Sequence, residues 1–452
     1  MGRLFGTNGV RGVANEDLTV GKVTRLAAAV GSHLGREIAV GRDGRTTSTM
    51  FRDAAVSGLL SVGCNVHDAG MLPTPALQHS VKHNGLDGGL MITASHNPPE
   101  FNGVKVIASD GVEIPREQEA EIEELYFSGD PKPSPWDQMG TIRTLSAIEP
   151  YKEAVKSHVD GGAVKKAGLK IAIDPGNGVA ALTAPEIARD LGCKVYTVNV
   201  NVNGRFPGRD SEPRPDNLEG LKRLVRASGA DLGIAFDGDG DRSMFVDEKG
   251  EVHWGDRSVA LIAKDFMAKN PGERVASAVN SSKVLDDVVT AAGGSVVRTR
   301  VGSVVISRVM VDQGIMFGGE ENGGIMYGPH LQVRDGSMAM ALMLEIMAKA
   351  GRPLSELFSE LPRYHQLKGK VPCPEELKER ALEALRGSVD APEVETIDGV
   401  KLGYQDGSWI LFRPSGTEPV FRIYAEAGSP ERVAGLMDEH RALIESVIGS
   451  LG

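Results

Sequence analysis

Residues 20–41, VGKVTRLAAAVGSHLGREIAVG, place an amphipathic segment directly before a short apolar one. Within residues 20–34 the apolar side chains recur at helical spacing, as in an α-helix with one buried face. Residues 37–41 then form a brief apolar run, which predicts a buried strand. The same alternation of helix and strand continues to about residue 200. It predicts α/β layers built on mixed, largely parallel sheets.

The chain of 452 residues is too long for a single hydrophobic core. Gly129-Asp-Pro-Lys-Pro-Ser-Pro-Trp136 has three prolines in five residues and indicates a linker. The C-terminal part differs, because close-set strands there lie between two helices, which predicts a smaller α+β domain. We expect three successive α/β domains at residues 1–150, 151–252 and 253–364, followed by the α+β domain at 365–452. No internal repeat is visible at the level of residues.

The composition argues against several classes of function. The formal charge is −11, from 50 basic and 61 acidic residues, so no general nucleic-acid-binding surface is implied. Three widely separated cysteines, Cys64, Cys193 and Cys373, fit a reduced compartment. The start, MGRLFGTNGVRG, lacks the apolar run of a signal peptide, and no apolar run is long enough to span a membrane. We therefore expect a cytoplasmic protein without nucleic-acid or membrane partners.

A serine loop, Thr93-Ala-Ser95-His96-Asn97-Pro98-Pro99, follows the apolar run of residues 88–93. The end of a strand is where α/β folds place their ligand-binding loops. The alternative is a plain turn, in which Ser95 or Asn97 bonds the local backbone. No Gly-x-Ser-x-Gly elbow is present, so a hydrolase serine is not supported.

An acidic loop, Asp237-Gly-Asp239-Gly-Asp241-Arg242, lies between two apolar runs that predict strands. Three carboxylates separated only by glycines can converge on one cation, and oxygen ligands suit Mg²⁺ or Ca²⁺. A solvated acidic turn is the alternative, but clustered carboxylates repel one another without a cation. Arg242 fits a place where phosphate oxygens meet the metal.

Two further polar loops follow. In Gly318-Gly-Glu320-Glu321-Asn322-Gly-Gly324, glycines allow close approach of a ligand, and Glu320 with Asn322 can bind neighbouring sugar hydroxyls. In the segment Arg413-Pro-Ser415-Gly416-Thr417-Glu418-Pro-Val-Phe-Arg422, two arginines and two hydroxyls form a candidate phosphate clamp. The alternatives are a flexible loop and an ordinary hairpin.

Taken together and in this order, the four loops resemble those of the α-D-phosphohexomutase family. This family includes phosphoglucomutases, phosphomannomutases and phosphoglucosamine mutases. The resemblance runs from Phe5-Gly-Thr-Asn-Gly-Val-Arg11-Gly12 to the Arg413 loop, which is nearly the full length. It implies four domains around a deep central cleft, with one loop from each domain lining it.

The resemblance also implies roles for individual residues. Ser95 is the expected phosphorylated nucleophile, and its phosphate would hold one Mg²⁺ together with Asp237, Asp239 and Asp241. The phosphoserine site would be lined by Arg11, His96 and Lys105, with Lys105 as the proton carrier. Substrate binding is expected from Arg242, Glu320, Asn322, Arg413, Ser415, Gly416, Thr417 and, as a further addition, Arg422. Neighbouring cations and the metal would lower the pKa of Lys105 toward working pH.

The sugar loop departs from the common pattern of the family. Many members have Gly-Glu-x-Ser-Gly-His where this chain has Gly319-Glu320-Glu321-Asn322-Gly323-Gly324. Asn322 can donate two hydrogen bonds where a serine donates one. Gly324 has no side chain, so no histidine at this position can help to move protons, and Lys105 becomes the favoured proton carrier. This form of the loop looks most like that of the archaeal-type phosphoglucosamine mutases.

We therefore expect an isomerase of hexose phosphates that converts glucosamine 6-phosphate to glucosamine 1-phosphate, with a hexose 1,6-bisphosphate as intermediate and activator. The alternative within the family is a phosphomannomutase/phosphoglucomutase. A more distant alternative is an Mg-dependent sugar phosphatase, but a phosphatase does not need a clamp at Arg413 that retains the product. A sugar-phosphate-binding protein would not need both Ser95 and the three carboxylates. We expect a monomer or a homodimer.

Overall fold

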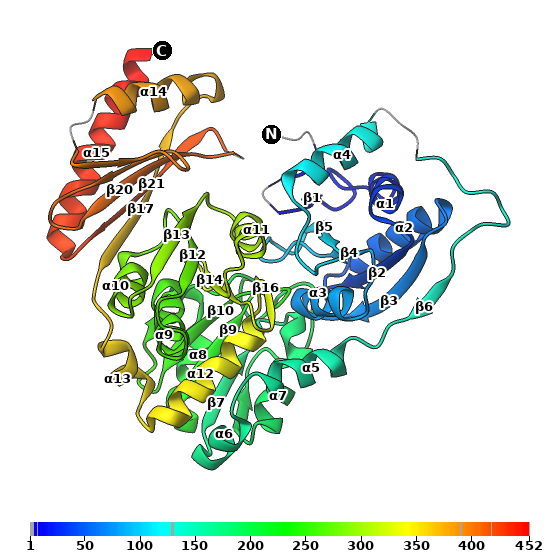
Figure 1. Cartoon of the computed structure of the whole chain (residues 1–452), viewed down its shortest axis with the longest axis horizontal. Coiled ribbons are helices and arrows are strands. Elements are labelled where there is room, and N and C mark those ends of the chain that lie inside the picture. The colour runs from blue at the N-terminus through cyan, green and yellow to red at the C-terminus, as the bar shows by residue number, and fades with distance from the viewer. Residues whose placement is uncertain (1–3, 7, 128–130, 389–390, 417, 452) are drawn as a thin grey trace.

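The computed structural model describes residues 4–6, 8–127, 131–388, 391–416 and 418–451. They form four units, each a sheet with its own helices, that follow one another along the chain (Figure 1). Residues 129 and 130 of the predicted linker lie outside the described residues, and the rest of the linker leads to a short strand of the first sheet. Among the described residues, none of the helices combines the length and hydropathy of a transmembrane segment.

The first unit has a six-stranded sheet with a parallel centre and an antiparallel edge. In spatial order its strands are β1 (Val10–Val13), β5 (Phe101–Ala108), β4 (Gly88–Ile92), β2 (Glu37–Arg42), β3 (Asn65–Met71) and β6 (Ile142–Thr144). Its helices are α1 (Val20–Leu34), α2 (Ser48–Ser61), α3 (Thr74–His83) and α4 (Arg116–Phe127). The helix and the strand predicted from residues 20–41 are confirmed as α1 and β2.

The second unit continues with a five-stranded sheet. Its strands, in spatial order, are β11 (Val252–His253), β10 (Ser243–Asp247), β9 (Leu232–Phe236), β7 (Lys170–Asp174) and β8 (Lys194–Thr197). Its helices are α5 (Ile148–Ser157), α6 (Gly161–Ala167), α7 (Ala184–Asp190) and α8 (Glu219–Ser228).

The third unit repeats the strand order of the second. Its strands are β13 (Ser295–Thr299), β12 (Arg274–Ala278), β14 (Phe317–Gly319), β15 (Ile325–Tyr327) and β16 (Leu331–Arg334). Its helices are α9 (Gly255–Lys269), α10 (Lys283–Ala291), α11 (Ser303–Gln313), α12 (Gly336–Ala350) and α13 (Leu354–Ser359). In both sheets the first three strands in the chain pair in parallel, and the last two are antiparallel additions at one edge.

The fourth unit is a fully antiparallel sheet with two long helices packed on it. Its strands are β17 (His365–Pro372), β21 (Val420–Ala427), β20 (Trp409–Pro414), β19 (Val400–Gly403) and β18 (Glu393–Glu395), and its helices are α14 (Lys378–Ser388) and α15 (Pro430–Leu451). The predicted fold class, three α/β domains with mixed sheets and a smaller α+β domain, is therefore confirmed.

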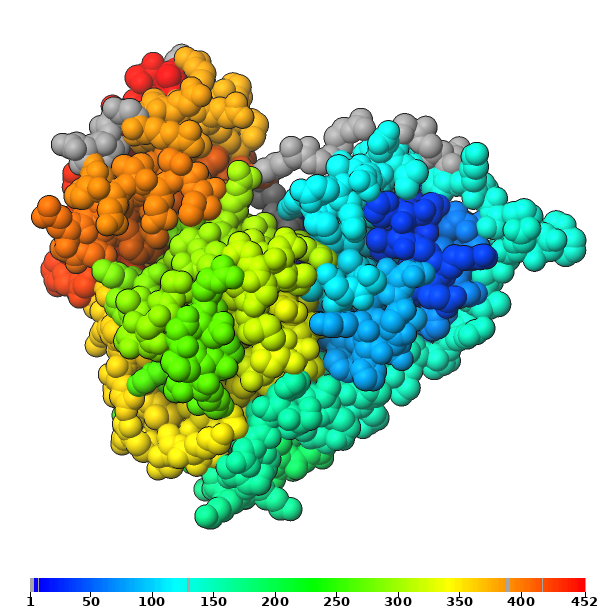
Figure 2. Space-filling view, in the orientation of Figure 1, coloured from blue at the N-terminus to red at the C-terminus, as the bar shows by residue number. Residues whose placement is uncertain are grey.

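The cores show how firmly the units are joined. One apolar cluster runs through the first three units, and the almost fully buried α12 packs against α5, α6 and α7 of the second unit. The fourth unit has a separate core and contacts the third through a small cluster around Trp409. Figure 2 shows a notch between the fourth unit and α4 of the first. The first three units thus form one continuous scaffold, and the fourth is attached to it through a smaller interface.

Candidate active site

Ser95 occupies a strained position three residues after the end of β4. Its φ is +50°, in the left-handed region that a non-glycine residue adopts at a cost, and its side chain is fully buried. The backbone N–H of Ser95 donates to Thr93 Oγ1 at 2.8 Å. The Ser95 hydroxyl donates to Asp237 Oδ2, also at 2.8 Å. The serine loop of the first unit therefore meets the acidic loop of the second, although 142 positions separate them in the sequence.

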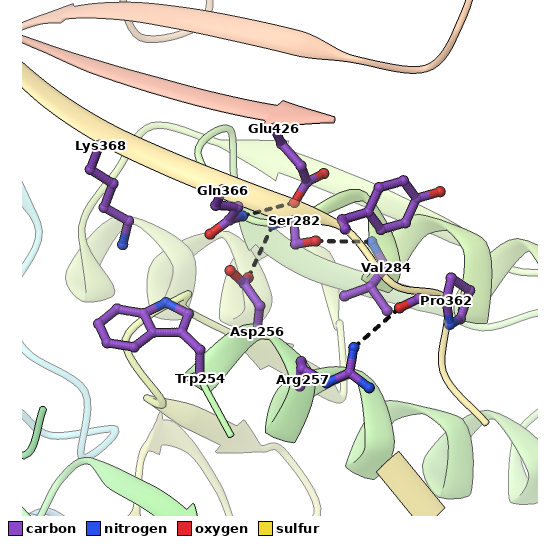
Figure 3. Close-up of a pocket in the computed structure, with 10 residues that line it drawn as sticks. Trp254, Asp256, Arg257, Ser282, Val284, Pro362, Gln366, Lys368 and Glu426 are labelled. Atoms are coloured by element: carbon purple, nitrogen blue, oxygen red, sulfur yellow. Dashed lines mark hydrogen bonds between the residues drawn. The ribbon is translucent and has the colours of Figure 1, made fainter. Parts of the chain in front are cut away.

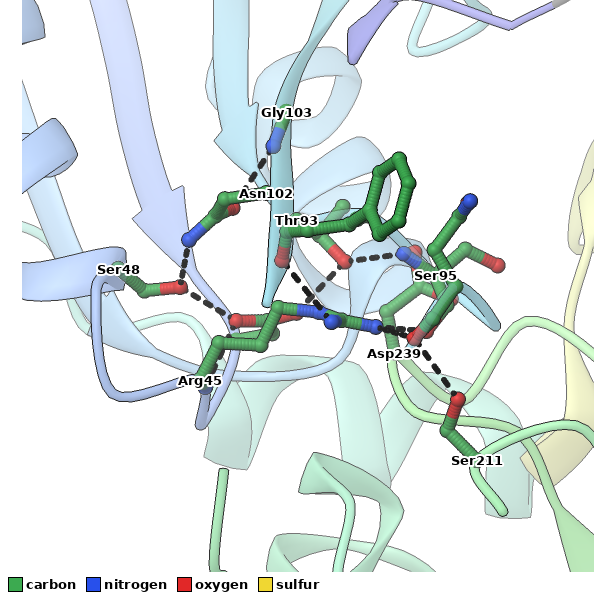
Figure 4. A network of polar contacts seen from close by, with 12 residues as sticks. Arg45, Ser48, Thr93, Ser95, Asn102, Gly103, Ser211 and Asp239 are labelled. Carbon is green, nitrogen blue, oxygen red and sulfur yellow. Dashed lines mark hydrogen bonds and ion pairs between the residues drawn. The ribbon is translucent and has the colours of Figure 1, made fainter. Parts of the chain in front are cut away.

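The buried side chain of Arg45 holds the serine loop in shape (Figure 4). Its guanidinium donates to four carbonyl oxygens at 2.6–3.0 Å, those of Ser95, Asn97, Pro98 and Phe101. Asp43 balances its charge at 3.1 Å. Sequence reasoning missed Arg45, and the available signal was its place in a polar turn after the predicted strand of residues 37–41.

The acidic loop joins β9 to β10 and gathers three buried carboxylates. Asp237, Asp239 and Asp241 each present an oxygen within 4.8 Å of the other two. Gly240 has φ +76°, so a glycine suits this turn. Asp239 Oδ1 and Asp241 Oδ1 are buried and have no hydrogen-bond partner among the residues that the structure describes. Buried carboxylate oxygens without a hydrogen-bond partner, within a cluster of three carboxylates, fit a hard divalent cation.

The ionisation of the three carboxyl groups supports this fit. Burial and the charges of Asp241 and Asp239 raise the pKa of Asp237 well above its usual value. Burial also opposes ionisation of Asp239, but the Lys105 ammonium outweighs it and lowers the pKa of that carboxyl. At Asp241 burial is likewise outweighed, here mainly by the Arg334 guanidinium, and the pKa is lowered. A cation among the three would relieve the carboxylate repulsion that, together with burial, raises the pKa of Asp237.

Lys105, on β5, is the candidate proton carrier and lies at the centre of these charges. Its Nζ donates to Asp239 Oδ2 at 2.8 Å and to Asp241 Oδ2 at 2.9 Å, and its side chain is buried. Burial lowers the pKa of the ammonium, but the two carboxylates outweigh burial and raise it. The expected depression of this pKa is therefore wrong in direction for the chain alone, because the direct partners of Lys105 are carboxylates.

Three other predicted residues surround the same centre. Arg11, on β1, donates to Asn97 Oδ1 at 2.8 Å and to the Ala94 carbonyl at 3.3 Å, and burial lowers its pKa to about 10. The His96 Nδ1 lies 3.4 Å from Ser95 Oγ, and burial with two nearby guanidinium groups lowers the pKa of the imidazole. Arg242 donates to Glu212 Oε1 at 2.8 Å. These cations make the surroundings of Ser95 suitable for an anionic group.

The sugar loop reaches the same centre from the third unit. Glu320 is buried, and its Oε2 accepts a hydrogen bond from Arg334 at 3.0 Å. Arg334 also donates to Asp241 Oδ2 at 2.5 Å, so it connects the sugar loop to the acidic loop. Asn322 Oδ1 accepts from the Gly324 N–H at 3.2 Å, which shapes the loop from within. Sequence reasoning missed Arg334, which no motif marked.

The neighbouring residue Glu321 makes its contacts elsewhere, with Trp254 and Lys368, two residues that line a space at the seam with the fourth unit (Figure 3). It forms an ion pair with Lys368 of β17, and the Lys368 ammonium lies 4.5 Å from the centre of the Trp254 ring. The seam contains a cavity of about 380 Å³, and Asp256 is among the residues that line it. Burial and the charge of Glu321 raise the pKa of Asp256 to about 7. Lys368 thus ties the fourth unit to the end of the sugar loop.

The phosphate clamp predicted at Arg413 opens into a separate cavity of about 620 Å³. Arg413, Ser415, Gly416 and Arg422 line it together with Arg116 and Arg300 from two other units. Arg413 Nε donates to Asp398 Oδ2 at 2.6 Å, and the N–H of Val301 donates to the same oxygen at 3.0 Å. Thr417 lies outside the described residues.

The predicted residues therefore form two clusters. The first, around Ser95, unites residues from three units: Arg11, Ser95, His96, Lys105, Asp237, Asp239, Asp241, Arg242 and Glu320. The second is the arginine-lined cavity of the fourth unit. The first can bind a cation beside a buried hydroxyl, and the second has the charge to bind a phosphate.

Comparison with known proteins gives matches along almost the whole chain. Residues 2–132, 149–250 and 254–364 match the phosphoglucomutase/phosphomannomutase α/β/α domains I, II and III, and residues 369–443 match the C-terminal domain of the same proteins. A phosphoglucomutase/phosphomannomutase of Thermococcus kodakarensis is 42% identical over 99% of this chain and 100% of the relative. A phosphoglucosamine/phosphogalactosamine mutase of Sulfurisphaera tokodaii is 44% identical over 98% of this chain and 100% of the relative. A crystal structure of a family protein from Burkholderia thailandensis has a TM-score of 0.89 at 27% identity, covering 98% of this chain and 97% of that one.

Proposed function

The chain belongs to the phosphoglucomutase/phosphomannomutase family, and from that premise we propose that it moves a phosphoryl group between the two ends of a hexose through phosphorylated Ser95. One observation carries the proposal. The Ser95 hydroxyl is buried, its backbone is held at φ +50°, and it lies 2.8 Å from the first of three clustered carboxylates. A serine whose only task was to end a strand would not need a strained backbone beside a cation site.

In this proposal phospho-Ser95 transfers its phosphoryl group to the free hydroxyl of a hexose monophosphate. Lys105 first accepts the proton of that hydroxyl and later returns a proton to the serine, while Arg11 and neutral His96 face the phosphoryl oxygens. Magnesium held by Asp237, Asp239 and Asp241 would neutralise charge on the transferring group. Lys105 donates to two of these carboxylates, Asp239 and Asp241. It can therefore lose its proton and serve as a base only when another cation pairs with these two carboxylates.

The product of the first transfer is a hexose 1,6-bisphosphate, which turns around and returns its other phosphate to Ser95. While the bisphosphate reorients, the second cluster would hold the phosphate group that is not reacting. We assign that role to Arg413, Ser415, Gly416 and Thr417, with Arg422 beside them. Glu320 and Asn322 would bind sugar hydroxyls in both orientations, and Arg242 would face the phosphate near the metal.

Glucosamine phosphate is the sugar that we propose first, because the form of the sugar loop and the 44% identical relative both favour it. A phosphoglucomutase/phosphomannomutase is the second candidate, favoured by the 42% identical relative. The two differ in the C2 substituent, an amine against a hydroxyl. No contact of Glu320 or Asn322 decides between them.

Rates on purified protein separate these candidates. Glucosamine 6-phosphate, glucose 1-phosphate and mannose 1-phosphate are supplied separately with Mg²⁺ and a trace of the matching bisphosphate, while isomer and free phosphate are both measured. The proposal expects isomer with glucosamine 6-phosphate as the best substrate. Higher kcat/KM for glucose or mannose phosphate would favour the second candidate. Steady release of phosphate without isomer would contradict both.

A further inference from the structure

Arg334 is a buried cation that no motif predicted, at the point where the acidic loop and the sugar loop meet. It ends β16, and its two terminal nitrogens take different partners. Nη1 donates to Glu320 Oε2 at 3.0 Å, and Nη2 donates to Asp241 Oδ2 at 2.5 Å. One guanidinium therefore bonds the candidate sugar-binding carboxylate and a candidate metal ligand at the same time. The planar guanidinium has two terminal nitrogens at a fixed separation, so it also fixes the distance between the two carboxylates that it bonds.

The space that Arg334 fills lies directly over Gly324. A Cβ at position 324 would stand 2.5 Å from Arg334 Cδ and 3.0 Å from its Cγ. The space that a side chain at position 324 would enter is therefore occupied by a side chain that starts on β16. Gly324 is not in a left-handed conformation, so the lack of a side chain there reflects crowding by Arg334 and not the needs of the backbone.

The backbone next to Arg334 is anchored, which fixes where its guanidinium can reach. The following residue, Asp335, caps α12 by accepting from the Met338 N–H at 2.9 Å, and it also accepts from the Tyr151 hydroxyl at 2.7 Å. Gly336 donates to the Gly240 carbonyl of the acidic loop at 3.3 Å. A Cβ at position 336 would stand 2.8 Å from Phe236 Cδ1 and 3.0 Å from the carbonyl oxygens of Gly240 and Arg242. The segment of residues 334–336 thus lies against the acidic loop.

We propose that Arg334 is a positioning residue that joins the acidic loop and the sugar loop into one unit and takes the space of the side chain that position 324 lacks. Its charge balances Asp241 on one side and Glu320 on the other. This linkage holds Glu320 beside the acidic loop and leaves the other oxygen of Asp241, which has no hydrogen-bond partner among the described residues, available to a cation. The inference rests on the proposed function for its kinetic consequences, but the linkage itself is independent of the reaction.

The test is a cycle of Gly324→Ala, Arg334→Ala and the double variant, with Arg334→Lys as the conservative change. In the parent, a methyl group at position 324 must displace the guanidinium, so Gly324→Ala alone should lower kcat/KM by roughly 10²-fold, as expected for a shift of about 1 Å. Arg334→Ala should raise KM, because Glu320 loses its hydrogen-bond partner. It should also lower kcat, because Asp241 loses the same partner. The double variant should be no worse than Arg334→Ala alone. Arg334→Lys should recover part of the loss.

The matched control is Arg308→Met, which removes another interdomain arginine, one that pairs with Asp110 at 2.7 Å and bonds neither loop. Arg308→Met should lower thermal stability and leave unchanged the preference for one sugar phosphate over another, measured as the ratio of the two kcat/KM values. Arg334→Ala should instead weaken this preference, so that the ratio moves toward one.

Losses that multiply in the double variant, or an unchanged KM in Arg334→Ala, would overturn the inference. The same cycle is read by thermal unfolding: Gly324→Ala should lower the midpoint in the parent and not in Arg334→Ala. Thermal unfolding therefore tests the link between the two loops even if the parent shows no mutase activity. In that case the proposed function would fail, and the inference about Arg334 would still stand.

Discussion

Gly238 lies between two of the candidate metal ligands and faces the backbone of the serine loop. A Cβ at this position would stand 2.5 Å from the Ser95 carbonyl oxygen, closer than the 3.0 Å that real Cβ atoms keep. Gly238→Ala must therefore separate the two loops by about 0.9 Å to restore an ordinary contact of 3.4 Å. Arg45 bonds the same carbonyl at 2.9 Å, so the serine loop cannot simply turn away.

The expected loss follows from that displacement. It would lengthen the 2.8 Å contact between Ser95 Oγ and Asp237 beyond hydrogen-bonding range. Misplacing a reacting group by about 1 Å costs roughly 10²-fold in rate, which corresponds to about 2.7 kcal/mol in the barrier. Overpacking should also cost about 1–3 kcal/mol of stability. KM for the sugar phosphate should change little, because the phosphate clamp belongs to another unit.

Steady-state kinetics on folded protein measure this effect. The matched control is Gly220→Ala in α8 of the same unit, where a Cβ meets nothing within 4 Å and where alanine favours the helix. Gly220→Ala should keep the parental kcat and unfold at the same or a higher temperature. A parental kcat in Gly238→Ala would refute the contact argument. So would a fall in kcat that matches the fraction of unfolded protein, because the loss would then be one of folding and not of alignment.

Two further predictions concern charge. Lys105→Met removes the ammonium and keeps the length of the side chain, so kcat should fall by roughly 10²–10⁴-fold. The control is Lys82→Met, which removes an exposed lysine and should leave kcat unchanged. A parental kcat in Lys105→Met would contradict the role of Lys105 as proton carrier. For Asp256, the folded pKa of about 7 lies above the ordinary 3.8, so between these values the folded protein binds a proton that the unfolded chain has lost. Stability from this group is therefore present at acid pH and is lost as the pH rises toward 7. Asp256→Asn should raise the denaturant midpoint relative to the parent at pH 8 and leave it nearly equal at pH 4; the opposite order would contradict the assignment.

The local elements of the fold could be predicted because their periodicity is strong. The helix and strand of residues 20–41 and the apolar α12 both follow from the spacing of their side chains. Helix α3 could not be predicted in the same way, because Pro73-Thr-Pro75 at its start is a pattern typical of a turn. Pro75 in fact lies in the first turn of α3, where a missing N–H costs nothing. The repeated strand order of the second and third sheets was not visible, since strand order depends on packing and not on shared residues.

The candidate site likewise contains residues that could be predicted from local sequence and residues that could not. The three carboxylates could be predicted to converge because glycines separate them within one short loop. Their meeting with Ser95 came only from the family resemblance, since 142 positions separate Ser95 from Asp237 and no local pattern links them. Arg45 and Arg334 were missed, because each acts through partners that only the tertiary structure brings near. For the same reason the expected direction of the Lys105 pKa does not hold for the chain alone: its direct partners, Asp239 and Asp241, are carboxylates and raise the pKa.

The central claim is that Ser95 carries the phosphoryl group, and one measurement addresses it directly. The purified chain is incubated with hexose 1,6-bisphosphate and Mg²⁺, digested, and analysed by mass spectrometry before and after a brief exposure to hexose monophosphate. The account predicts a phosphoryl group on the peptide that contains Ser95, its loss to the monophosphate, and neither event in Ser95→Ala, whose turnover falls by several orders of magnitude. A Ser95→Ala protein that still interconverts the sugar phosphates, with no phosphorylated peptide, would contradict it.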